Sequence, residues 1–177
     1  MALTYKNLDE RTRELMLDEI NLDVSQGTLY LSKRLTEEGK QNYEALLKEA
    51  IQNYDDAWLG NELRGRGYMQ SSEERRKPTG GFTTARVPAT AADTLAEGEF
   101  NRFYARGLCL RAIADGIREL VIYRAKEVRN PRAESEQMIG SRRDAKALLE
   151  DLRSSIGIEP ALGIPPGPNS GLSVYLP

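Results

Sequence analysis

The chain has 177 residues, one cysteine, no histidine and a formal net charge of −2. The absence of histidine excludes Ser–His–Asp and Cys–His nucleophile systems and histidine-ligated zinc, and the single Cys109 excludes an intramolecular disulfide and a thiolate zinc site. No apolar run is long enough to cross a bilayer. We therefore expect one ordinary core, no cofactor, no metal, no membrane partner and no enzymatic activity.

The charges are unevenly distributed along the chain. Residues 1–63 carry seven Lys/Arg against thirteen Asp/Glu, residues 64–143 carry sixteen against ten, and residues 144–177 carry two against four. The three blocks therefore have net charges of −6, +6 and −2. Opposed blocks of this kind can neutralise each other within one molecule, or they can attract neighbouring copies head to tail.

Capping residues followed by apolar side chains at helical spacing predict four helices besides the central one. They are residues 9–21 after a cap at Asn7 or Asp9, residues 36–54 from a cap at Thr36, residues 55–64 from a cap at Asp55, and residues 144–155 from a cap at Asp144. The acidic side chains of the first helix are expected to form a solvated face. A metal site at Asp18, Glu19 and Asp23 is the alternative, although these residues lack the spacing of a calcium loop.

The segment of residues 93–115 is predicted to be the central helix. Its apolar positions cover more than one stripe, so we expect contacts on several sides. Gly98 and Gly107 each disfavour a helix by about 1 kcal/mol relative to Ala, which favours close approach of another backbone at these positions. Gly116 is expected to end the helix in the left-handed conformation.

Phe100, Phe103 and Tyr104 are expected to be core aromatics on this helix. The alternative is a surface that stacks nucleic acid bases, with Arg102, Arg106 and Arg111 nearby. Cys109, in the same apolar helix, is expected to be a small buried side chain.

Two segments have strand character. Residues 27–32, GTLYLS, are rich in β-branched and aromatic side chains, and residues 120–123 are a short apolar run. Residues 119–128 as a whole remain open between strand and helix. We predict that the two segments pair, which requires that helices cover the small sheet.

Residues 64–88 lack any apolar period and contain four glycines and six Lys/Arg, with a net charge of +4. Long loops of this kind are usually functional or disordered. The sequence lacks the GxxxxGK[ST] pattern of a phosphate-binding loop. The alternative to a functional loop is a plain solvated insertion with a tip at residues 80–82. The candidate contacts to a partner or to phosphate are Arg64, Arg66, Arg75, Arg76, Lys77 and Arg86.

Residues 157–177 carry five of the eight prolines and have no helix signal. Consecutive prolines favour an extended, preordered segment, and the alternation near the end favours a strand added to an exposed edge. A frayed tail is the alternative. The candidate residues of this subunit-docking arm are Ile164, Pro165, Pro166, Pro168, Leu172, Val174, Tyr175 and Leu176.

Together these features predict a mainly α fold. We expect four to five helices around a central helix, one or two short β segments, a long basic loop and an extended C-terminal arm. The predicted organisation is an acidic helical part (1–63), a basic loop (64–88), a part that shares the first core (89–156) and the arm (157–177).

The order of these elements is similar in outline to the small helical neck or adaptor proteins of tailed phages, which pair a helical body with a long loop and a terminal arm. The resemblance covers element order alone and implies a structural protein that oligomerises, with copies of itself or other proteins of an assembly as partners. The first residues, MALTYKNLDE, lack the regions of a signal peptide, so we expect a cytoplasmic or virion location.

Two other functions stay open. A nucleic-acid-binding or regulatory protein would use the basic residues of 64–86 on phosphates. An enzyme would need a carboxylate cluster such as Glu97, Glu99 and Glu119, without the support of a recognisable motif.

Overall fold

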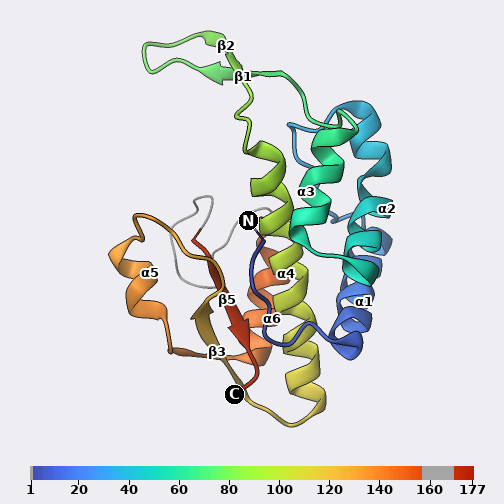
Figure 1. The fold of residues 1–177 in the computed structure, drawn as a ribbon, viewed down its shortest axis with the longest axis vertical. Coiled ribbons are helices and arrows are strands. Elements are labelled where there is room, and N and C mark those ends of the chain that lie inside the picture. The colour runs from blue at the N-terminus through green and yellow to red at the C-terminus, as the bar shows by residue number, and fades with distance from the viewer. Residues whose placement is uncertain (1, 157–169) are drawn as a thin grey trace.

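The computed structural model describes residues 2–156 and 170–177, which are mainly helical with a few short strands in two small sheets (Figure 1). The helices are α1 (Glu10–Gln26), α2 (Glu37–Asn53), α3 (Asp56–Gly65), α4 (Ala91–Ala114), α5 (Ala133–Met138) and α6 (Ala145–Ser154). The strands are β1 (Ser72–Arg76), β2 (Phe82–Arg86), β3 (Glu119–Arg124), β4 (Arg142–Asp144) and β5 (Leu172–Tyr175). The mainly helical class predicted from the sequence is confirmed.

Helix α4 packs against α1, α3 and α6 and also touches β3 and β5. Phe100, Phe103 and Tyr104 are at most 1% exposed, which confirms them as core residues. The alternative of a base-stacking surface is therefore wrong for these three side chains. Cys109 is also fully buried.

Gly107 lets α1 approach α4 closely. A Cβ atom at this position would lie 2.9 Å from the Cγ atom of Met16 and 3.2 Å from the carbonyl oxygen of Thr12, both on α1. The predicted close approach is thus confirmed at Gly107. It is wrong at Gly98, where a Cβ atom would meet nothing within 4 Å.

The guanidinium of Arg106 on α4 is buried against two carboxylates of α1. Its Nε donates to Oε2 of Glu19 at 2.6 Å, and its Nη1 and Nη2 donate to the carboxylate of Asp23 at 2.7 and 2.8 Å. Arg153 of α6 binds Glu19 from the other side, with Nε 3.0 Å from Oε2. Helices α1, α4 and α6 are therefore joined by one charged network inside the body.

The helix starts follow the predicted caps. The side chains of Asp9, Thr36, Asp55 and Asp144 each accept a hydrogen bond from a backbone N–H in the first turn of the following helix. Asn7 is not a cap, because its Oδ1 accepts the N–H of Leu176 at 3.0 Å. Gly116 has a φ of 70°, which confirms the left-handed end of α4.

The predicted strand at residues 27–32 is wrong. The backbone N–H of Thr28 bonds the carbonyl of Asp23 as α1 ends, and the segment forms no ladder among the described residues. The central strand β3, which was open between strand and helix, already has β4 and β5 as its two antiparallel neighbours. Both edges of β3 are therefore occupied, so the segment at 27–32 cannot pair with β3 as predicted.

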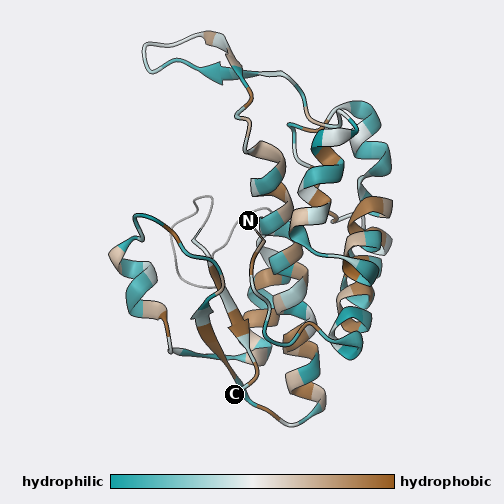
Figure 2. Ribbon diagram, in the orientation of Figure 1, coloured by the Kyte–Doolittle hydropathy of each residue, from teal (hydrophilic) through white to brown (hydrophobic). Residues whose placement is uncertain are grey.

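The structure also contains two elements that lie between the predicted strand and the last helix. A short helix, α5, and the strand β4 lie within residues 130–144. The strand predicted near the end of the C-terminal arm is confirmed as β5, which pairs with β3 of its own chain. Its Leu172 and Val174 are 1% exposed, so the end of the arm completes the core of its own chain (Figure 2).

Replacing Arg106 by Met should destabilise the fold by about 3–5 kcal/mol, because the variant leaves the buried carboxylate of Asp23 without its cation and leaves Glu19 with Arg153 alone. Urea unfolding checks this free energy. The control is Arg11→Met, which removes a solvent-exposed pair with Asp115 and should cost about 1 kcal/mol or less. A loss below about 1 kcal/mol for Arg106→Met would contradict the structural role of the network.

Replacing Leu172 by Ala should destabilise the fold by about 2–5 kcal/mol, because a fully buried side chain is truncated. Thermal or urea unfolding measures the change. The same truncation at Leu31, which is 43% exposed, should stay within about 0.5 kcal/mol. Equal effects at the two positions would mean that β5 does not belong to the core.

Candidate interaction surface

The segment predicted as a long loop contains a β-hairpin that projects beyond the helical body (Figure 1). Strands β1 and β2 pair antiparallel in the register Ser72↔Arg86 to Arg76↔Phe82. Gly80 and Gly81 close the turn with φ values of 92° and 76°, a region that favours glycine. The prediction of an irregular loop at residues 64–88 is therefore wrong for 72–86.

The two faces of the hairpin differ in burial. Residues that face each other across an antiparallel pair project to the same side of the ribbon. The side that holds Glu73 and Ala85 is the one turned toward the body, since these are the only residues of β1 and β2 that are not exposed. The opposite side, which we call the outer face, carries Ser72, Glu74, Arg76, Phe82, Thr84 and Arg86.

The root of the hairpin is anchored to the body. The Nε atom of Arg34 donates to Oε2 of Glu73 at 2.7 Å, and Met69 forms an isolated bridge with Leu35. The N–H of Val87, which is buried, donates to the carbonyl of Ser71 at 3.0 Å. The strands themselves extend past these contacts, so the hairpin has a fixed base and an exposed end.

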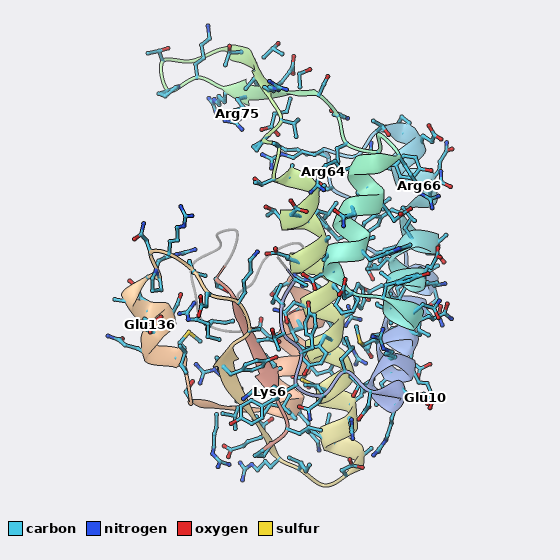
Figure 3. The ribbon with its side chains drawn as sticks, in the orientation of Figure 1. Lys6, Glu10, Arg64, Arg66, Arg75 and Glu136 are labelled. Carbon is cyan, nitrogen blue, oxygen red and sulfur yellow. The ribbon has the colours of Figure 1, made fainter. Side chains whose placement is uncertain are left out.

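The structure separates the six basic residues predicted as one contact set. Three are already in ion pairs: Arg64 with Asp93, Arg66 with Glu62, and Arg75 with Glu73. Figure 3 shows Arg64 and Arg66 at the C-terminal end of α3 and Arg75 on the hairpin, away from them. Within residues 2–156 and 170–177, Arg76, Lys77 and Arg86 form no ion pair, and all three are exposed.

The position of the Phe82 side chain on the outer face is the feature of the hairpin that the sequence did not indicate. The sequence places Phe82 in a loop tip at residues 80–82. The strand register instead places it opposite Arg76 on the outer face, with 69% of its surface exposed. The outer face thus combines one large aromatic side chain with two guanidinium groups, Arg76 and Arg86.

The other basic residues considered for nucleic acid are not available on the surface. Arg102 and Arg106 are 7% and 1% exposed. Arg111 pairs with Asp9 at 2.6 Å. A phosphate-contacting surface made of the hairpin and these arginines of α4 is therefore wrong.

The carboxylates considered for catalysis do not converge. Glu97 pairs with Lys126, Glu99 lies 3.4 Å from Arg102, and Glu119 lies 3.7 Å from Arg142. Glu19 and Asp23, considered for a metal, are bound by Arg106. Across the described part of the chain, no group of three or more Cys, Asp or Glu is placed to hold a metal ion.

Half of the residues predicted for the docking arm can be placed. Leu172 and Val174 are in the core, while Tyr175 packs edge-on against the ring of Tyr123, with centroids 5.5 Å apart. Leu176 packs partly buried at the rim of the core. The predicted contacts at Ile164, Pro165, Pro166 and Pro168 lie outside the described residues.

Comparison with known protein families, curated proteins and solved structures finds no significant match to this chain. Among the described helices, none has both the length and the apolar character needed to cross a membrane. Any functional conclusion therefore depends on the chain's own surface and core.

Glu99 should make the stability of the fold depend on pH. Burial raises its pKa from 4.5 to about 7, Arg102 opposes this, and Asp23 adds to it. Since the folded state holds this proton more tightly than the unfolded state, the stabilisation is present below pH 4.5 and is lost as the pH rises through about 7.

The variant Glu99→Gln should therefore gain stability relative to the native chain as the pH is raised. Urea unfolding at about pH 5 and about pH 8 measures this difference, which should increase by about 1–3 kcal/mol. Glu127→Gln, at an exposed position, controls for the general effect of removing a carboxylate. A difference for Glu99→Gln that does not change with pH would contradict the assignment.

Proposed function

We propose that this chain is a structural, assembly-type protein whose β1–β2 hairpin binds a neighbouring subunit. The observation that carries the proposal is the exposed outer face of the projecting hairpin, where Phe82 lies opposite Arg76 and Arg86 lies farther along the same face. A two-stranded hairpin without a covering layer is marginally stable in water. A partner that covers its outer face would bury the aromatic ring and stabilise the strands.

The distribution of charge supports the same proposal. The hairpin lies in the block of residues 64–143, with a net charge of +6, whereas residues 1–63 have −6. A basic element of one copy could meet the acidic part of the next copy, as in a head-to-tail assembly. The helical body, proposed as a bundle around α4, would then serve as a rigid support.

We also propose the C-terminal arm as a contact between subunits, but only by strand exchange. Strand β5 fills the edge of its own sheet and contributes Leu172 and Val174 to the core. A contact between subunits through this strand would have to be an exchange, in which β5 of one copy pairs with β3 of another. The virion neck or adaptor role suggested by the order of elements is one setting for such an assembly.

Nucleic acid binding is the second candidate function, favoured by one specific observation. A two-stranded β-ribbon fits the major groove of DNA, and the outer face offers unpaired cations and an aromatic ring. The reduced number of available arginines weakens this candidate, because Arg64, Arg66 and Arg75 already have carboxylate partners.

The double variant Phe82→Ser with Arg76→Ser tests the proposal. Light scattering should show the native chain as a defined oligomer at low salt and the variant at the mass of one chain, 19.8 kDa. Stability should change by less than about 0.5 kcal/mol, because both side chains are exposed. The matched control is Ile139→Ser with Arg118→Ser, which removes an exposed apolar and an exposed basic side chain elsewhere.

Two outcomes would contradict the proposal. One is a hairpin variant that keeps the mass of the native oligomer. The other is a native chain that is a monomer and binds DNA with a steep salt dependence that the hairpin variant loses, which would establish the second candidate instead.

A further inference from the structure

The surface of this chain has a hollow where α2 ends and α3 begins, with a volume of about 630 Å³. Tyr54 and Trp58 stack at its wall, with ring centroids 4.4 Å apart and an interplanar angle of 11°. Tyr54 is 43% exposed. Leu3 and Leu8 of the N-terminal segment add apolar surface. The hollow therefore combines aromatic rings with polar groups in a concave surface, a combination typical of ligand sites.

The hollow also contains a carboxylate. Asp55 lines it and accepts the N–H of Trp58 at 2.9 Å with Oδ1, and a carboxylate can accept several donors at once. The cation Arg13 lines the hollow too, but its Nη1 donates to the carbonyl of Tyr54 at 3.0 Å and so is directed at the end of α2. All the lining side chains belong to the acidic block of residues 1–63.

We propose that this hollow receives the side chains of Phe82 and Arg76 from the hairpin of a second copy of the chain. The inference rests on the proposed function and adds the site that accepts the hairpin. Phe82 would extend the aromatic cluster of Tyr54 and Trp58. The guanidinium of Arg76, which lies opposite Phe82 on the same face, would pack over an aromatic ring or bind the carboxylate of Asp55.

The contact has to be between molecules. The hollow lies at the start of α3 and the hairpin follows its end, so the two are separated by a helix of ten residues, about 15 Å long. Figure 1 shows the hairpin pointing away from the body beyond that end. Because the hairpin residues Phe82 and Arg76 and the hollow are different patches of one chain, the contact is heterologous. Such a contact produces a closed ring or an open filament.

Disulfide trapping tests the contact directly in the full chain. One preparation carries Thr84→Cys, next to Phe82 on the outer face, and the other carries Asn53→Cys, which lines the hollow, with a tag that changes its mass. Phe82, Arg76, Tyr54 and Asp55 stay in place, and the native Cys109 is fully buried and does not compete. After mixing and mild oxidation, the mixed disulfide between the two preparations should exceed the Thr84→Cys homodimer. Pairing Thr84→Cys with Gln137→Cys, an exposed position on α5, is the control.

A second measurement uses variants of the hollow without cysteine. Tyr54→Ala and Asp55→Asn should each weaken self-association about tenfold or more, the effect expected of a contact at the centre of an interface. Asn is as good an N-cap as Asp, so Asp55→Asn should leave α3 intact. The expected result is weaker self-association with unchanged thermal stability.

The failures of the two proposals are distinguishable. If Thr84→Cys reacts equally with Gln137→Cys and Asn53→Cys, or if the hollow variants associate like the native chain, the hollow is the wrong site while the hairpin stays the binding element. If the native chain does not associate and the hairpin variants change only DNA binding, both the accepting site and the assembly role are overturned.

Discussion

The buried guanidinium of Arg106 is the interaction on which the helical body depends. It lies between α4 and α1 and donates to Glu19 and Asp23, while Arg153 brings α6 to the same carboxylate of Glu19. The contact is geometrically tight because Gly107, the next residue, has no side chain to hold α1 away. Charges taken out of water are costly unless each finds its partner, so the network fixes how the helices sit against one another.

The β1–β2 hairpin, unlike the helical body, is anchored at one end only. Its root is held by the ion pair of Arg34 with Glu73, whereas every residue of its outer face is exposed in the described part of the chain. Elements with few buried apolar contacts open at low free energy and are the ones that proteins use to bind partners. The chain therefore joins a body whose buried Arg106 is paired with carboxylates to a basic, exposed hairpin, and the assembly proposal gives that hairpin a partner.

Much of the helical part could be predicted from the sequence because its signals are local. The caps Thr36, Asp55 and Asp144 stand within three residues of the N–H groups they bind. The central helix, expected at residues 93–115, is found at Ala91–Ala114. The buried network could not be predicted in the same way, since Arg106 meets acids 83 and 87 residues away in the chain.

The strands show why the sheet pairing and the outer face of the hairpin could not be predicted. Residues 27–32 have strand-forming side chains, but β4 and β5 occupy both sides of β3, their predicted partner. The polar sequence SEERR instead forms β1 because Gly80 and Gly81 turn the chain back onto it. Strand propensity depends on such context more than helix propensity does. The outer face was missed for the same reason, because the register of the hairpin decides that Phe82 and Arg76 share a side.

Hydrogen–deuterium exchange at low and high protein concentration tests the central claim most directly. The amides of the helical body around α4 should exchange slowly and equally in both conditions, because its core does not depend on a neighbour. The amides of residues 72–86 and 53–58 should exchange faster when the protein is dilute and become protected together when it is concentrated. Equal protection of both segments at every concentration would contradict the account, since it would mean that the hairpin and the hollow do not take part in contact between copies.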